Sequence, residues 1–248
     1  MATPYQDFAE YYDRLMAGRY VRAWWTLFKR LAAERRLRFT SVADLAGGTG
    51  EAARRFARVG AHVTIVDRSE AMLERARRRV PSAITLRQDL RRLRLPEPVD
   101  LAVSVFGGLN YLPTARDVAK VFRRVRKVLK PGGVWCVDAV TPFHLRKNFG
   151  KGADFFEGPD YVSIWRYQWD PLHTRSRIHV DGFRRDGRAW QRYRPEEHIH
   201  YGYPLPVLRQ ALREAGFVRI EAFGMPFGAP ARTRDTHWVL WCRADREA

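Results

Sequence analysis

The feature that most constrains the fold is the regular alternation of short apolar segments with amphipathic helical ones. Seven segments have the length and residue content of buried strands, and they cover residues 41–46, 62–67, 83–88, 100–106, 134–140, 217–223 and 236–244. Helical periodicity covers residues 51–59, 70–80, 117–129 and 206–215. This order predicts an α/β fold, a Rossmann-like, doubly wound, seven-stranded sheet. No helix separates the last two strands, so we expect a hairpin and an antiparallel last strand.

Two further segments complete the predicted architecture. Residues 5–17 and 20–36 have helical spacing and predict an N-terminal helical lid. Residues 155–200 lack a helical period, and Asp186-Gly187 is a strong hairpin signal, which predicts a small inserted antiparallel β-sheet. We expect one domain over residues 1–248, divided into a cap, a core and an insertion: residues 1–38, residues 39–141 with 202–244, and residues 142–201.

The chain is strongly basic, with a formal net charge of +18 from 45 basic and 27 acidic residues. All but six of the basic residues are arginine, and they are spread along the chain, for example over residues 75–79 and 123–127. One interpretation is a groove for RNA or another polyanion. The other is a coding bias toward arginine on solvated helix faces. Charge alone does not specify a substrate, because a polyanion gains from such a field without a shaped site.

Several classes of protein are disfavoured by what the sequence does not contain. It has no apolar run of about 18 residues, so we expect no spanning helix and no membrane partner. Its first residues lack the order of a signal peptide. Cys136 and Cys242 lie in strand-like segments, which indicates buried thiols rather than disulfides. We therefore expect a cytoplasmic protein.

The loop after the first predicted strand carries the strongest local signal. Its sequence, Asp44-Leu45-Ala46-Gly47-Gly48-Thr49-Gly50, follows a strand and precedes a helix. Glycines at this place let backbone N–H groups and the positive end of the helix approach a ligand. The loop also fits a dinucleotide-binding fingerprint, and Asp67 ends the next strand, where an acid can bind a ribose. These two features alone leave a dinucleotide and S-adenosylmethionine as candidate ligands.

Carboxylates around the loop favour S-adenosylmethionine. Asp44 would lie beneath the loop, where it would repel a pyrophosphate but not an ammonium or sulfonium group. Gln88 and Asp89 end the third strand, and such an acid can accept a hydrogen bond from the amino group of adenine. Phe106 ends the fourth strand, and two glycines follow it where a ligand must pass. Because the carboxyl ends of adjacent parallel strands meet at one edge, we expect these residues to form one site.

The segment VADLAGGTGEAARRFA resembles the first motif of class I methyltransferases, whose usual form has glycine where this chain has Ala46. Asp67 resembles the ribose-binding acid of the second motif. Arg68 and Met72 fall where that family packs the adenosine.

Two more motifs support the same resemblance, which covers about residues 5–243. Gln88-Asp89-Leu90 resembles the adenine-side motif, and residues 129–133 resemble the turn before the fifth strand. The residues expected to bind S-adenosylmethionine are Asp44, Ala46, Gly47, Gly48, Gly50, Asp67, Arg68, Met72, Gln88, Asp89, Leu90 and Phe106.

The insertion, with Glu196-Glu197-His198-Ile199-His200 near its end, resembles a bacterial branch similar to the sugar-amine N-methyltransferases. That branch usually carries Asp-Ser where this chain has Gly107-Gly108, which removes a carboxylate and a hydroxyl from the site mouth. The resemblance implies methyl transfer from S-adenosylmethionine to an N or O nucleophile of a small molecule, with S-adenosylhomocysteine as the product.

Candidate catalytic residues are few, because an in-line displacement chiefly requires that the nucleophile be held against the methyl carbon. Tyr12 matches a tyrosine that in related enzymes folds over the methyl donor. His198 and His200 are two residues apart on a strand-like segment, so they share a face. If that face looks into the cleft, one of them could act as a base or anchor the substrate. No third ligand accompanies them and the neighbouring glutamates, so we predict no metal site.

Two other functions stay open. The first is an RNA (tRNA or rRNA) methyltransferase that uses the basic surface, which predicts arginines converging beside the donor pocket. The second is a non-catalytic module that binds S-adenosylmethionine. A dehydrogenase is the main rival for the fold. The inserted sheet could also mediate a homodimer.

Overall fold

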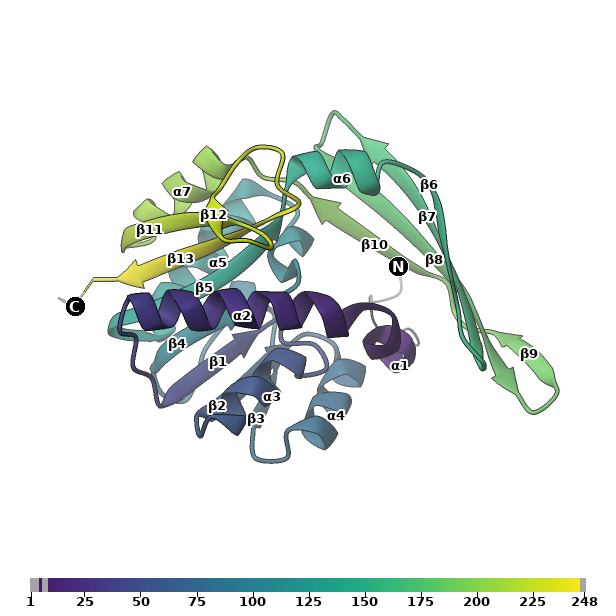
Figure 1. The fold of residues 1–248 in the computed structure, drawn as a ribbon, viewed down its shortest axis with the longest axis horizontal. Coiled ribbons are helices and arrows are strands. Elements are labelled where there is room, and N and C mark those ends of the chain that lie inside the picture. Colours follow the sequence, from purple (N-terminus) through teal and green to yellow (C-terminus); the bar gives the residue numbers. More distant parts are fainter. Residues whose placement is uncertain (1–4, 6–8, 246–248) are drawn as a thin grey trace.

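A computed structural model describes residue 5 and residues 9–245 of the chain, and a large sheet lies at its centre (Figure 1). Its strands follow the order β12-β11-β13-β5-β4-β1-β2-β3. Neighbours from β5 to β3 are parallel, whereas β13 is antiparallel to both β5 and β11. The bounds are β1 Ser41–Leu45, β2 His62–Asp67, β3 Ile84–Arg87, β4 Val99–Ser104, β5 Leu129–Val140, β11 Phe217–Gly224, β12 Ala229–Pro230 and β13 His237–Ala244. The predicted sheet and its antiparallel last strand are confirmed, and β12 adds a short eighth strand at the edge.

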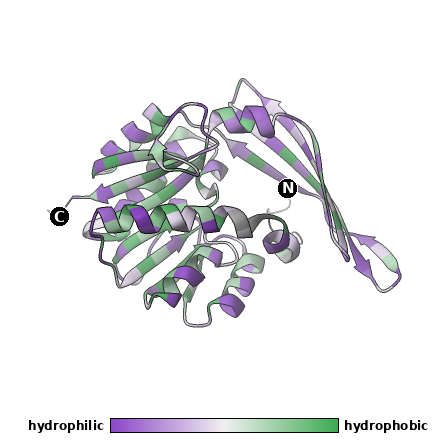
Figure 2. Cartoon of the chain, viewed as in Figure 1, coloured by the Kyte–Doolittle hydropathy of each residue, from purple (hydrophilic) through white to green (hydrophobic). Residues whose placement is uncertain are grey.

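Helices cover both faces of this sheet because each buries an apolar stripe against it. In the longest helix, Trp24, Phe28 and Leu31 recur at helical spacing and are almost completely buried. Figure 2 shows the same division, with hydrophobic strands inside and hydrophilic outer helix surfaces. Three helices pack on one face and two on the other: α2 (Gly18–Glu34), α3 (Glu51–Arg58) and α4 (Glu70–Arg79), against α5 (Ala115–Val128) and α7 (Leu205–Glu214).

The N-terminal part continues into α2 without a turn. After α1 (Ala9–Tyr12) a π-helical segment covers Asp13–Ala17, and the residues that flank this segment have right-handed helical backbone angles. The helix predicted over residues 5–17 therefore lies partly outside the described residues. Among the helices described, none has the length and apolarity that a membrane span requires.

Two boundaries differ from the sequence-based expectation. β5 begins at Leu129, directly after α5, because the predicted Pro-Gly-Gly turn is accommodated as a bulge inside the strand. The pairing shifts there from Val99↔Leu129 to Leu101↔Val134. A helix, α6 (Pro142–Asn148), also opens the insertion, where no helix was expected. Thr141 caps α6, since its hydroxyl accepts a hydrogen bond from the His144 backbone N–H at 3.0 Å.

The inserted sheet extends from the core as a long curved arm (Figure 1). Its strands are antiparallel in the order β10-β8-β7-β6, and β9 pairs with β8. The expected hairpin joins β8 to β9, and Gly187 there has a φ of 60°. The bounds are β6 Lys151–Glu157, β7 Tyr161–Asp170, β8 Arg175–Asp186, β9 Ala189–Arg192 and β10 Glu196–Tyr201. Apolar residues of β7 and β8 pack against Tyr5, Tyr12 and Leu15, so the arm holds the N-terminal residues over the main sheet.

Candidate active site

The glycine loop after β1 has the backbone that its sequence predicts. Gly48 and Gly50 have φ angles of 53° and 78°, and Ala46 also has a positive φ of 54°. A Cβ at Gly47 would lie 2.9 Å from the Asp44 carboxyl carbon and from the Ile65 side chain, so only glycine fits there. A Cβ at Gly48 would have no neighbour closer than 4.0 Å, which leaves the loop open on that side.

Asp44 lies beneath this loop, as expected. Its side chain is buried, and one carboxylate oxygen accepts a hydrogen bond from the Ala53 backbone N–H at 3.0 Å. Burial raises the pKa of Asp44 to about 7, because an ionised carboxylate loses its hydration there. Asp44 therefore shapes the loop and adds negative charge beneath it when ionised.

Asp67, at the end of β2, is the acid that reaches into the cavity. Its two oxygens accept hydrogen bonds from the backbone N–H groups of Gly48 and Ser69, each at 2.9 Å. Burial raises its pKa, and these hydrogen bonds partly offset the effect. A carboxylate has about four acceptor positions, so this side chain keeps capacity for ligand hydroxyl groups.

The residues after β3 form the next part of the wall, where a short 3₁₀ helix covers Leu90–Arg92. Asp89 caps it and accepts hydrogen bonds from the Arg91 guanidinium, whose proximity lowers the pKa of Asp89. The Gln88 side-chain amide donates a hydrogen bond to the Arg94 carbonyl and accepts one from the Arg94 backbone N–H, each at 2.9 Å. Its side chain therefore supports the turn.

These strand tips surround one cavity of about 460 Å³, a size typical of small-ligand sites. Of the residues predicted to bind the donor, nine line it: Ala46, Gly48, Asp67, Arg68, Met72, Gln88, Asp89, Leu90 and Phe106. Asp44, Gly47 and Gly50 do not line it: Asp44 lies beneath the loop, and the two glycines allow the backbone of the loop to adopt its conformation. The remaining lining residues are Tyr5, Tyr12, Arg91, Val105, Gly108, Tyr111, Leu112, Pro113, Pro195, Glu197, Ile199 and Tyr201.

Three tyrosines bring the N-terminal part over this cavity. Tyr12 lies on α1 and packs edge-on against Tyr5, with ring centroids 5.4 Å apart, and against Phe106 at 6.3 Å. Tyr5 in turn bonds through its hydroxyl to Tyr111, on the short helix Gly108–Tyr111. Burial raises the pKa of Tyr12 well above its usual value, so its phenol stays neutral. Tyr12 thus lines the cavity, and its expected place over the methyl donor stays a prediction.

The condition under which His198 or His200 could act directly on a substrate, that their shared face looks into the cavity, is not met. The two residues do share a face of β10, but Glu197, Ile199 and Tyr201 on the opposite face line the cavity. His200 has both ring nitrogens buried without a hydrogen-bond partner, and burial lowers its pKa to about 3. His198 is buried and contacts two residues that line the cavity: its Nδ1 bonds to the Tyr111 hydroxyl at 2.7 Å, and its ring packs edge-on against Tyr5 with centroids 4.7 Å apart.

Asp138, which the sequence places near the tip of the fifth strand as a possible substrate contact, positions the loop after β4. It lies fully buried near the end of β5 and accepts hydrogen bonds of 2.6 Å from the backbone N–H groups of Phe106 and Gly107 and from the Tyr20 hydroxyl. These bonds hold Phe106 at a φ of 72°, which is unusual for a non-glycine residue. An acid at the tip of the fifth strand was the available signal.

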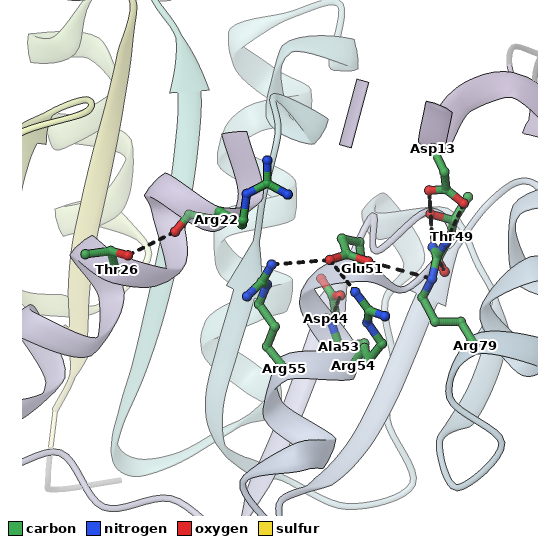
Figure 3. Close-up of polar contacts among 10 residues, drawn as sticks. All are labelled: Asp13, Arg22, Thr26, Asp44, Thr49, Glu51, Ala53, Arg54, Arg55 and Arg79. Atoms are coloured by element: carbon green, nitrogen blue, oxygen red, sulfur yellow. Dashed lines mark hydrogen bonds and ion pairs between the residues drawn. The ribbon is translucent and has the colours of Figure 1, made fainter. Parts of the chain in front are cut away.

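An ion-pair network fastens the cap to the glycine loop (Figure 3). Arg79, at the end of α4, pairs with Asp13 at 2.5 Å and donates to the backbone and hydroxyl oxygens of Thr49 at 2.7 and 2.6 Å. The Thr49 hydroxyl also donates to Asp13 at 2.5 Å. Three segments far apart in the sequence therefore meet beside the cavity. We call this group of three residues the cap latch.

No three histidine, cysteine, aspartate or glutamate side chains within residue 5 and residues 9–245 are grouped as metal ligands.

The sheet order, the glycine loop and the acids at the strand tips define a nucleoside-binding α/β enzyme of the methyltransferase type.

Comparison with known proteins identifies the family. A family model described as a methyltransferase domain matches residues 42–133. The Bacillus subtilis (strain 168) protein YqeM, which is named as a methyltransferase, is 32% identical over 218 residues, or 86% of each chain. A Streptomyces venezuelae enzyme, dTDP-3-amino-3,4,6-trideoxy-alpha-D-glucopyranose N,N-dimethyltransferase, is 31% identical over 113 residues, 46% of each chain. The crystal structure of a Clostridium acetobutylicum S-adenosylmethionine-dependent methyltransferase matches with a TM-score of 0.85 and 22% identity, covering 98% of this chain and all of that one.

The chain belongs to the methyltransferases, and it shares its fold with the S-adenosylmethionine-dependent enzyme from Clostridium acetobutylicum. The cavity fits S-adenosylmethionine, because the loop is open at Gly48 and Asp67 keeps acceptor capacity toward it. Apolar side chains of Met72, Leu90 and Phe106 line the same cavity and can pack against an adenosine.

Proposed function

We propose that this enzyme transfers a methyl group from S-adenosylmethionine to the amine nitrogen of a small molecule of the amino-sugar class. The observation that carries the proposal is the roof over the donor cavity. β10 and Tyr5 close it from above, so the space of about 460 Å³ suits a nucleoside and a small acceptor. The Streptomyces venezuelae relative, named for an amino sugar, supports the acceptor class.

Acidic residues would hold the cationic donor and exclude a diphosphate. Asp67 would accept hydrogen bonds from the ribose hydroxyls, while Ala46 and Gly48 would present backbone groups to the donor. Bound S-adenosylmethionine supplies an activated methyl group on a sulfonium. The remaining task of the protein is to hold the acceptor nitrogen in line and to keep water out.

Glu197 would serve the acceptor. Its carboxylate lines the cavity from β10 and lies 3.5 Å from the exposed His179 ring. A carboxylate there attracts an amine and orients it through a charge-assisted hydrogen bond. The Tyr12 ring, which closes the N-terminal side, would limit how far the amine can move.

The test begins with calorimetry of S-adenosylhomocysteine binding. Wild type should bind it in preference to nicotinamide dinucleotides, and Asp67→Ala should weaken binding at least tenfold, because one charge-assisted hydrogen bond contributes about 1.5–3 kcal/mol. Asp186→Ala is the matched control, since that carboxylate lies on the exposed end of the arm and bonds to Gln191.

Methyl transfer is then measured by mass spectrometry with a panel of nucleotide-linked amino sugars, matched hydroxyl sugars and total tRNA. Transfer to an amine supports the proposal. Transfer to tRNA or to hydroxyl sugars alone would overturn the acceptor assignment. Failure to bind S-adenosylhomocysteine would overturn the donor site.

A further inference from the structure

Four side chains form a continuous polar chain from the donor cavity into the inserted sheet. The hydroxyl groups of Tyr5 and Tyr111 bond to each other, and both residues line the cavity. The Tyr111 hydroxyl bonds to Nδ1 of His198 at 2.7 Å. On the other side of the ring, Nε2 of His198 lies 3.3 Å from Oε2 of Glu196. We call these four residues the tyrosine–histidine relay.

The inner end of this relay is shielded from water. The side chains of His198 and Glu196 are 4% and 1% exposed. Placing an acid and an imidazole there is costly unless they interact with each other and with further polar groups. The Glu196 carboxyl also accepts the backbone N–H of Tyr5 at 2.6 Å, which ties the relay to the segment that roofs the cavity.

The charge of Glu196 sets the direction of the hydrogen bond between His198 and Tyr111. The contact between Nε2 of His198 and Oε2 of Glu196 is a close charge contact rather than a hydrogen bond, and the negative charge of the carboxylate favours a proton on Nε2. Nδ1 is then an acceptor, and the Tyr111 hydroxyl donates to it. An imidazole oriented by a carboxylate on one side and bonded to a hydroxyl on the other is arranged to take a proton from that hydroxyl.

We propose that the tyrosine–histidine relay removes the proton that the acceptor amine loses during methylation, a role that rests on the function proposed above. The amine lone pair forms the new N–C bond while the sulfur–carbon bond breaks and its electron pair stays on sulfur. An N–H proton of the methylated amine passes to the Tyr111 oxygen as the Tyr111 proton moves to Nδ1 of His198. Glu196 stabilises the imidazolium that results.

Other charged groups around the relay are few. On β10, burial lowers the pKa of the neighbouring His200, so that His200 stays neutral. Burial raises the pKa of Tyr111 well above its usual value, and the Arg68 guanidinium, 5.3 Å from the Tyr111 ring centroid, partly offsets this rise through its positive charge. The negative charge of Asp67, at the end of β2, raises the pKa of the Tyr5 hydroxyl. Glu196 is thus the carboxylate within the relay that bears directly on His198.

The first test needs no acceptor. Nitrogen-15 NMR of the histidine-labelled protein should show His198 with a protonated Nε2 and an acceptor-type Nδ1. Glu196→Gln should remove this preference, and Tyr111→Phe should shift the Nδ1 resonance. Tyr167→Phe is the control, because its hydroxyl bonds to Asp154 outside the relay. A proton on Nδ1 in the wild type would overturn the proposal.

The second test uses the best amine substrate from the methyl-transfer panel. His198→Gln and Tyr111→Phe should lower kcat by about 10²–10⁴-fold, the usual contribution of a positioned base, with little change in KM. The deficit should shrink as pH rises, since free hydroxide then takes the proton. A deficit that is independent of pH, or none at all, would refute the relay even where donor binding and methyl transfer stand.

Discussion

The glycine loop and the loop after β4 meet at a contact that yields a quantitative prediction. A Cβ added at Gly108 would lie 2.8 Å from the Cβ of Ala46. Two methyl groups at rest are about 3.5–4.0 Å apart, so Gly108→Ala must push the loops apart by roughly 1 Å. Overpacking of this kind costs about 1–3 kcal/mol. The alanine at position 46 and the glycine at position 108 are therefore a matched pair.

Ala46→Gly should release this constraint and relieve backbone strain as well. Its φ of 54° is unfavourable for an L-residue by about 1–2 kcal/mol. Glycine adds about 0.5–1 kcal/mol of unfolded-state entropy, so the single variant should be about 0–1.5 kcal/mol more stable than wild type. In the Ala46→Gly background, Gly108→Ala should change the free energy of unfolding only slightly, which gives a coupling energy of about 1–3 kcal/mol between the two positions.

Urea unfolding of the wild type, both single variants and the double variant measures that coupling. Gly60→Ala is the control, because it has a φ of 86° and no heavy atom within 4 Å of the added Cβ. Its effect should add to that of Ala46→Gly. If Gly108→Ala costs the same with and without Ala46, within the 0.5 kcal/mol or so of ordinary additivity, the contact is not limiting and the reasoning fails.

Two further outcomes follow from the described contacts. Arg79→Gln should break the contacts of the cap latch, which lowers the free energy of unfolding by about 1–2 kcal/mol and weakens S-adenosylhomocysteine binding in calorimetry. Arg55→Gln is the control and should leave binding unchanged, because Arg55 pairs with Glu51 within α3. Asp44 keeps its proton in the folded protein up to its pKa of about 7, while the unfolded chain releases it near pH 4. The free energy of unfolding should therefore fall as pH rises from about 4 to 7, by on the order of a few kcal/mol, and Asp44→Asn should flatten the curve measured by urea titration.

The donor half of the site could be predicted because its geometry is local. Asp44, the glycines and Ala46 lie within seven consecutive residues between a strand and a helix. Asp67 and Asp89 follow strands whose parallel order is a consequence of the alternating pattern. Each of these features depends on turn chemistry and periodicity, which a short sequence window contains.

The acceptor half depends on contacts between distant residues. Tyr111 bonds to His198 across 87 residues and to Tyr5 across 106 residues. Asp138 reaches the Phe106 backbone across 32 residues. No periodicity within one segment reports such pairs. The missed helix at Pro142 is different, because its cap at Thr141 is local and was readable from the sequence.

The positions of His198 and His200 show what the sequence alone could not predict. Alternation along β10 fixed which residues share a face, but only the pairing of His198 with Ile178 on β8 determines which face meets the cavity. A slip of one residue in that register would exchange His198 and His200 for Glu197 and Ile199. A buried acid and imidazole on the packed face would oppose the observed register unless other polar groups bonded to them, and here the Tyr5 backbone N–H bonds to Glu196 and the Tyr111 hydroxyl bonds to His198. The hydrogen bonds of the relay thus stabilise this register, and they connect the buried His198 to the cavity through the Tyr111 hydroxyl.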